Sequence, residues 1–146
     1  MSDISKELHG YYFDDLEVGT KGVFGKTVTE ADIANFAGVS GDTNPVHLNE
    51  EFAATTRFGT RIAHGMLSAS FISAVLGTKL PGPGCIYLSQ NLKFLAPVKI
   101  GDTVVARVTV TELRPEKRRA MLKTVCTVGE TVVIDGEAMV YVPPRK

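Results

Sequence analysis

One uncharged stretch near the middle of the chain limits the possible folds more than any other feature. From Ile62 to Thr78 there are seventeen residues without a charged side chain, and Gly65–Leu76 is apolar on nearly every side of a helix. A helix of this kind must be surrounded by protein. The stretch contains Gly, Ser and His64, and it is too short and too polar to span a bilayer core of about 30 Å. We therefore expect a buried helix over Gly65–Leu76, ended by Gly77, and no membrane insertion.

The second half of the chain shows the alternation of apolar and polar residues that is typical of strands. Turn residues separate four predicted strands, which cover Cys85–Leu95, Thr103–Leu113, Arg119–Val128 and Thr131–Val142. Their direct connections predict an antiparallel meander with one face on a core. Gly129-Glu130 fits a two-residue hairpin of type II′. The apolar faces are expected to contain Ile86, Leu88, Leu92 and Phe94, then Val104, Ala106, Val108 and Val110, then Ala120, Leu122, Thr124, Cys126 and Val128, and finally Val132, Ile134, Ala138, Val140 and Val142.

The first half supplies the remaining helices. Thr29 is a suitable N-cap for a helix over Glu30–Ala37, and Asn49 is a suitable N-cap for a second, short helix. There is no internal repeat or linker, so we expect one domain over residues 1–146. The simplest arrangement is an α+β fold in which an antiparallel β-sheet wraps around the central α-helix.

The balance of charged residues argues against polyanionic partners. Sixteen Lys and Arg balance sixteen Asp and Glu, which leaves no net field to attract nucleic acid or an anionic membrane surface. The polar N-terminus lacks the apolar core of a signal peptide. We expect a soluble, cytoplasmic protein with no nucleic-acid or membrane partner.

The segment from Ser40 to His47 contains the strongest candidates for chemistry. Pro45 fixes its own φ and keeps Asn44 out of the helical region, which predicts a stiff, irregular loop. Asp42 and His47 lie on this path and could face one cavity, where a carboxylate and an imidazole can hold a water for acid–base chemistry. The alternative is that Asp42 and Asn44 only cap turns while His47 is packed.

A second candidate is the start of the buried helix, at His64-Gly65-Met66. Gly65 leaves its N–H accessible, and the first turn of a helix has unpaired N–H groups and the positive end of the dipole. Such donors could stabilise an enolate-like oxyanion, although Gly65 could equally serve close packing alone. His64 could be structural or functional. Asp42, His47 and His64 could in principle bind a metal, but they lack helical ligand spacing, and we expect no metal site.

Together these motifs resemble a known family. Ser40-Gly41-Asp42-x-Asn44-Pro45-x-His47, Ala53 and His64-Gly65-Met66 are similar to the MaoC-like, or hydratase 2, branch of the hot-dog fold, and to its single-domain (R)-specific enoyl-CoA hydratases. The resemblance extends from Leu16 to Val142 and includes Ile86-Tyr87-Leu88 and Phe94-x-x-Pro97-Val98-x-x-Gly101-Asp102.

The resemblance implies a role for each matching residue. Asp42 and His47 match the catalytic pair that holds the water added across the double bond, and the backbone N–H of Gly65 matches the donor to the thioester carbonyl. Asn44 matches a loop-organising asparagine, and Ser73 matches a serine close to the catalytic aspartate. Ile72 and Leu76 could line an acyl pocket, although an apolar helical stripe is more often core.

The resemblance also implies the substrate and the assembly. The expected reaction is reversible hydration of trans-2-enoyl-CoA to (R)-3-hydroxyacyl-CoA by a homodimer. No cofactor is expected, because CoA is part of the acyl-CoA substrate. The alternatives are a dehydratase for 3-hydroxyacyl-CoA or an acyl-carrier-protein substrate, a hot-dog thioesterase, and a non-catalytic acyl-CoA-binding module. Acyl chain length, carrier and pathway, such as fatty acid metabolism or polyhydroxyalkanoate supply, stay open.

Overall fold

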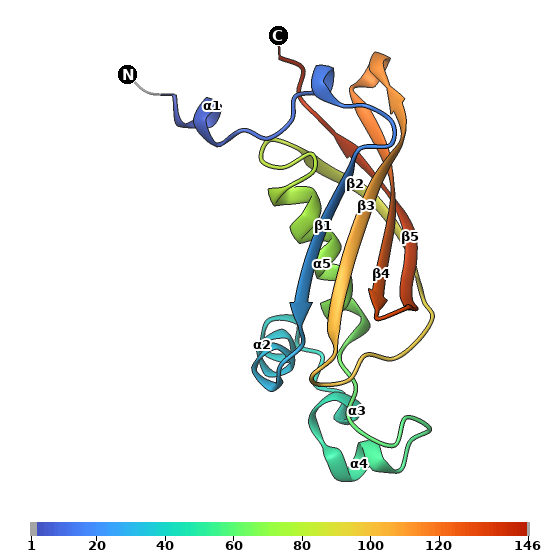
Figure 1. Ribbon diagram of the computed structural model, residues 1–146. Coiled ribbons are helices and arrows are strands. Elements are labelled where there is room, and N and C mark those ends of the chain that lie inside the picture. Colours follow the sequence, from blue (N-terminus) through green and yellow to red (C-terminus); the bar gives the residue numbers. More distant parts are fainter. Residues whose placement is uncertain (1–2, 146) are drawn as a thin grey trace.

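The computed structural model describes residues 3–145, in which an antiparallel β-sheet curls around one long helix (Figure 1). The five strands lie in the order β1-β3-β4-β5-β2. They are β1 (Lys21–Thr27), β2 (Ile86–Phe94), β3 (Thr103–Arg114), β4 (Arg119–Val128) and β5 (Thr131–Tyr141). The predicted α+β arrangement of a sheet around a central helix is confirmed.

The connections differ from the predicted meander at one point. Strands β3, β4 and β5 follow one another directly, and β4 meets β5 through the predicted Gly129-Glu130 loop, in which Gly129 has a φ of +57°. Strand β2 instead pairs with β5 at the far edge of the sheet. The connection over residues 95–102 contains Pro97, which cannot donate to a strand ladder, and it crosses the end of the sheet to reach β3 (Figure 1).

Strand β1 occupies the other edge and pairs with β3. The sequence does not predict this strand, because its seven residues include two Gly and two Lys. Large apolar side chains at Val23 and Phe24 alone do not establish an alternating pattern. Its place was therefore decided by pairing with β3 and by contact with the central helix.

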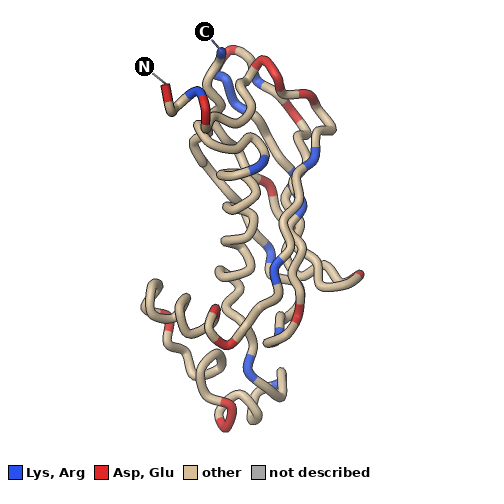
Figure 2. Tube along the Cα trace, turned by 60° about the vertical axis from the view of Figure 1, so that its left-hand side comes forward, with Lys and Arg blue, Asp and Glu red and all other residues tan. Residues whose placement is uncertain are grey.

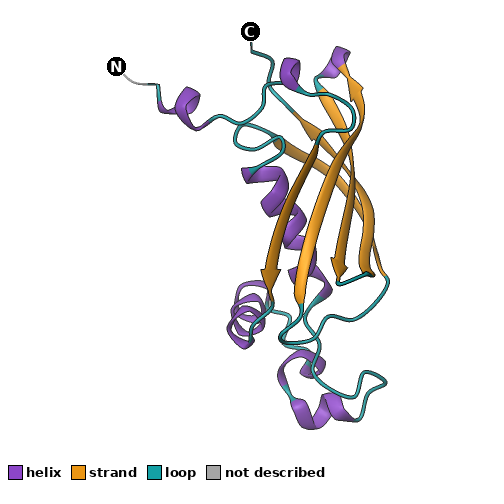
Figure 3. Ribbon diagram, in the orientation of Figure 1, coloured by secondary structure: helices purple, strands orange, loops and turns teal. Residues whose placement is uncertain are grey.

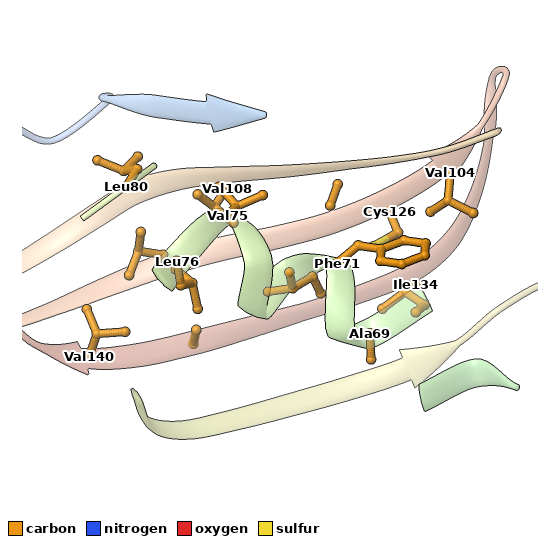
Figure 4. Packing of buried hydrophobic residues seen from close by; sticks show 14 of the residues in the cluster. Ala69, Phe71, Val75, Leu76, Leu80, Val104, Val108, Cys126, Ile134 and Val140 are labelled. Carbon is orange, nitrogen blue, oxygen red and sulfur yellow. The ribbon is translucent and has the colours of Figure 1, made fainter. Parts of the chain in front are cut away.

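The central helix α5 (Gly65–Thr78) lies against the inner face of the sheet (Figure 3). It runs two residues beyond the predicted end, so Gly77 is inside the helix and Lys79 caps it. Figure 4 shows Phe71, Val75 and Leu76 packed among side chains of β3, β4 and β5. The alternating residues predicted to face the core from β3 and from Ala120 to Cys126 of β4 are all buried.

Two of the predicted apolar faces are wrong in part. The pairing of β4 with β5 shifts next to Thr127, so Val132 is exposed and Val133 is buried in its place. A β-bulge of this kind moves side chains to the opposite face. On β2, Ile86, Leu88 and Phe94 are exposed, because this strand lies at the sheet edge.

Four shorter helices complete the fold within residues 3–145. They are α1 (Ile4–Leu8), α2 (Glu30–Ser40), α3 (Pro45–Leu48) and α4 (Glu50–Ala54), with 3-10 turns at Phe13–Asp15 and Pro115–Lys117. Thr29 caps α2 and Asn49 caps α4, as predicted, although α2 continues past Ala37 to Ser40. Helices α2, α3 and α4 gather at one end of the sheet, opposite the chain termini (Figure 1).

Charges of both signs are distributed along the chain, whereas α5 has none (Figure 2). This distribution agrees with the zero net charge of the sequence. Within residues 3–145, no helix is both long enough and apolar enough to cross a bilayer.

Candidate active site

The segment between α2 and α3 positions the carboxylate of Asp42. Helix α2 ends at Gly41, whose φ of +80° is a left-handed conformation that favours glycine. Asp42 follows, and its Oδ1 accepts the N–H of Asn44 at 3.2 Å. Asn44 Oδ1 in turn accepts the N–H of Val46 at 3.0 Å and caps α3. The predicted irregular loop is therefore wrong for Pro45–Leu48, which is a helical turn begun by proline.

His47 lies on α3 and is only 8% exposed. Its Nδ1–H donates to the Ile62 carbonyl at 2.8 Å, so in the neutral imidazole Nε2 has the free lone pair. Arg61 Nε donates to the His47 carbonyl at 2.7 Å, and Arg61 Nη1 forms an ion pair with Glu30 at 2.7 Å. These contacts fix both the ring and the backbone of His47.

The surroundings of His47 favour its neutral form. Burial lowers the pKa of this imidazole, and nearby His64 lowers it further, while the Ile62 hydrogen bond and the Asp42 carboxylate act in the opposite direction. The net pKa lies below the ordinary value of a histidine, so Nε2 is available as a base at neutral pH.

Asp42 and His47 meet across a short gap. His47 Nε2 and Asp42 Oδ2 are 4.0 Å apart, which is too far for a direct hydrogen bond. A water about 2.8 Å from each atom fits this gap and can donate one hydrogen to each. The oxygen lone pairs of that water then face away from the pair. The predicted juxtaposition of Asp42 and His47 is therefore present in the structure.

His64 is stacked on His47 and holds the backbone of Asp42. The ring centroids are 3.8 Å apart with planes 28° apart, and His64 Nε2–H donates to the Asp42 carbonyl at 2.9 Å. Ligand atoms of Asp42, His47 and His64 lie within 4.8 Å of one another. However, the imidazole lone pairs lie in the ring planes, so two nearly parallel rings cannot both point at one ion. As arranged, the three residues are better suited to holding a water than a metal.

Gly65 begins α5 beside this pair. The N–H groups of Gly65 and Met66 have no acceptor within residues 3–145, as expected for a helix start. The backbone of Gly65 does not have a positive φ. A Cβ at this position would be 2.7 Å from ring carbons of Phe94, so the aromatic ring of Phe94 lies over Gly65.

These groups line one cavity of about 410 Å³. Asp42, His47, His64 and Gly65 all contribute to its wall. The remaining wall is mostly apolar, with Arg57 as a cation, and consists of Arg57, Phe58, Ile62, Ala63, Met66, Ser68, Phe94, Leu95, Ala96, Pro97, Val98, Val133 and Ile134. A largely apolar cavity with a few convergent polar groups is typical of a small-molecule site.

The other predicted site residues lie elsewhere. Ser73 is on an exposed face of α5, about 12 Å along the helix from Gly65, and lines a separate hollow with Phe36, Tyr87 and Gln90. Ser73 does not line the cavity that contains Asp42, and its predicted proximity to Asp42 stays a prediction. Ile72 and Leu76 face the sheet in the hydrophobic core, are 0% and 1% exposed, and line neither hollow. The structure therefore places both side chains in the core, and their role in an acyl pocket stays a prediction.

Some contributors were not found from the sequence. Arg61 and the Ile62 carbonyl orient His47, and Phe94 covers Gly65, although Phe94 is about thirty residues away along the chain. Their positions have no local pattern that distinguishes them from surface or strand residues. Only the folded arrangement brings these residues to the site.

Comparisons with known proteins agree on one family. A model described as the MaoC like domain matches residues 17–134. An (R)-specific enoyl-CoA hydratase of Rhodospirillum rubrum is 62% identical over 135 residues, which cover 92% of this chain and 94% of the relative. A 3-hydroxybutyryl-CoA dehydratase of Methylorubrum extorquens is 56% identical, covering 96% of this chain and 89% of the relative.

Solved structures give the same result. An unliganded R-hydratase from Pseudomonas aeruginosa has a TM-score of 0.89 and 45% identity, and the match covers 94% of this chain and 89% of that one. An (R)-hydratase from A. caviae, described as involved in PHA biosynthesis, has a TM-score of 0.85 and 49% identity, with 88% and 98% covered. At these similarities the chains share one fold.

Proposed function

This chain belongs to the MaoC-like domain family, and we propose that it catalyses the reversible, (R)-specific hydration of trans-2-enoyl-CoA to (R)-3-hydroxyacyl-CoA. The observation that carries the proposal is the 4.0 Å gap between His47 Nε2 and Asp42 Oδ2 beside the start of α5. The names of the hydratase and dehydratase relatives describe the two directions of one such equilibrium.

The proposed reaction begins with a water held between Asp42 and His47. Both groups accept hydrogens from it, so its oxygen is directed at C3 of the enoyl group. As the C3–O bond forms, the pair takes one proton from the water and then gives one proton to C2. Water is thus added as OH and H on the same face, and the pair returns to its starting state. Each positioned acid–base group is worth about 10²–10⁴-fold in rate.

The thioester carbonyl would bind at the start of α5. Attack at C3 places negative charge on the thioester oxygen, and the unpaired N–H of Gly65 lies on the wall of the same cavity. The positive end of the helix dipole stabilises the same charge. This chemistry uses only groups of the chain and the CoA thioester, so we propose that it needs no metal or redox cofactor.

We propose that the catalytically active form is a homodimer. Strand β2 is at the edge of the sheet, and its exposed side chains include Ile86, Tyr87 and Leu88. An apolar edge strand that stays unpaired invites association. Antiparallel pairing of β2 with β2 of a second copy would give an isologous interface and one continuous sheet. The cytoplasmic location stays a prediction from the sequence.

The proposal is tested by mixing the purified protein with crotonyl-CoA. Hydration removes the ultraviolet absorbance of the conjugated enoyl thioester without releasing free thiol, and chiral analysis should give the (R)-3-hydroxy product. Release of free thiol would indicate a thioesterase, and binding without turnover would indicate an acyl-CoA-binding module. The same assay with the acyl group on acyl carrier protein identifies the carrier.

A further inference from the structure

Two polar atoms on the cavity wall have no hydrogen-bond partner within residues 3–145. They are Nδ1 of His64 and Oγ of Ser68, on side chains that are 2% and 1% exposed. Both residues line the cavity that contains Asp42 and His47. Because buried polar atoms nearly always have a partner, these two atoms point to an occupant of the cavity.

The two atoms have complementary hydrogen-bonding chemistry, and their residues are four positions apart. His64 Nε2–H donates to the Asp42 carbonyl, so Nδ1 is an acceptor. The Ser68 hydroxyl can donate or accept. Ser68 N–H donates to the His64 carbonyl at 3.5 Å, so the residues are one helical turn apart. His64 is the N-cap of α5, and the Cβ atoms of residues four apart on a helix are about 5–6 Å apart. One water that makes two hydrogen bonds of about 2.8 Å can connect polar atoms on side chains at this spacing.

We propose that His64 Nδ1 and Ser68 Oγ together bind a second water in this cavity, distinct from the water held between Asp42 and His47. The bound water donates to His64 Nδ1 and forms its other bond with the Ser68 hydroxyl. The buried apolar residues of the same cavity wall include Val133 and Ile134. Polar partners and sufficient space are the two requirements for a buried water.

This water has a consequence for substrate choice, which rests on the proposed hydratase function. An acyl chain too short to reach this wall leaves the water in place, whereas a chain long enough to reach the wall must expel it and leave both polar atoms unpaired. His64 and Ser68 thus select for short acyl chains. Displacing a well-ordered water with a group that cannot replace its hydrogen bonds loses affinity.

The water site can be tested without any substrate, using Ser68→Ala and the control Ser70→Ala. Ser70 is on the same helix, is exposed, and bonds to the Leu67 carbonyl. If the water is bound, Ser68→Ala should lower Tm by about 2–5 °C more than the control. If the hydroxyl is bare, its removal relieves an unpaired buried group and Tm rises, which overturns the proposal. A crystal structure of the ligand-free protein in which no water contacts His64 Nδ1 or Ser68 Oγ would also overturn the proposal.

The effect on substrate choice is measured by comparing kcat/KM for four-carbon and eight-carbon enoyl-CoA. In Ser68→Ala the ratio of the eight-carbon to the four-carbon value should rise about 2- to 10-fold, the worth of one hydrogen bond, and in Ser70→Ala it should stay unchanged. An unchanged ratio in Ser68→Ala overturns the selectivity role. Absence of hydration with every substrate contradicts the proposed function instead, while the Tm and crystallographic tests still decide the water site.

Discussion

Asp42 and His47 act on one water in the proposed reaction, so their contributions should not be independent. Asp42→Asn and His47→Gln should each keep the fold and lower kcat by about 10²–10⁴-fold. The double variant should lose much less than the product of the two single losses, because one intact partner cannot position the water alone. Steady-state kinetics of the four proteins, with a melting curve for each, give the comparison. Independent effects would contradict a shared water.

Burial of the His47 imidazole predicts the pH dependence of activity. Nε2 must be unprotonated to accept a proton, and its pKa is lowered, so the acidic limb of kcat/KM should have its midpoint below the ordinary histidine value of about 6.5. Because Asp42 raises the pKa of His47 and burial lowers it, an NMR titration of His47 in Asp42→Asn should give a still lower midpoint. A midpoint above that of an exposed histidine would contradict this description of the site.

The lowered pKa of His47 should make the folded protein less stable as pH falls. Between the lowered pKa of folded His47 and the ordinary value near 6.5, the unfolded chain binds more protons than the folded chain. The stability that His47 contributes is therefore complete above about pH 6.5 and is lost as pH falls through the folded pKa. Urea unfolding of wild type and His47→Gln across this window should show a loss that is smaller in the variant.

At the scale of elements, the start of α5 should matter through its backbone N–H. Gly65 is the first helical residue and does not have a positive φ, so proline is compatible with its backbone. Gly65→Pro removes the proposed donor and should lower kcat by about 10²–10³-fold. The proline ring introduced at position 65 would also approach Phe94. The control for this steric effect is Phe94→Ala, alone and combined with Gly65→Pro. Full turnover in a folded Gly65→Pro/Phe94→Ala variant would mean that another group donates the hydrogen bond to the thioester carbonyl.

The inner face of α5 should behave as core instead of pocket. Leu76 is 1% exposed among the residues that pack on the sheet, so Leu76→Ala should reduce the free energy of unfolding by about 2–5 kcal/mol. Because the side chain lines neither hollow, the ratio of kcat/KM for long and short enoyl-CoA should not change. A stable variant with altered chain-length preference would restore Leu76 to the acyl pocket.

For the whole molecule, the exposed edge of β2 predicts association. Sedimentation velocity should show twice the mass of one chain. Leu88→Lys puts a charge at a β2 position that is 41% exposed and should shift the protein toward the monomer, since like charges oppose edge pairing. The control is Val39→Lys, near the end of α2 and outside the sheet, where the side chain is 89% exposed. A monomeric, fully active wild type would contradict the dimer.

Much of this molecule could be predicted from short-range patterns along the chain. The buried helix, strands β3 to β5, and the caps at Thr29 and Asn49 each depend on residues a few positions apart. Asp42, Asn44 and His47 could be identified because their spacing is local and their turn chemistry is distinctive. Periodicity and capping are properties of neighbouring residues, so a single sequence contains them.

Contacts between distant segments were decided only by the tertiary structure. The pairing of β2 with β5, the burial of Val133 in place of Val132, and the core position of Leu76 depend on how strands align and which face α5 presents. At the site, the Ile62 carbonyl sets the tautomer of His47, Phe94 covers Gly65, and Ser68 shares a cavity with Asp42. The sequence by itself determined which groups could do chemistry. Packing decided which of them meet, because burial and hydrogen-bond geometry arise only when remote segments come together.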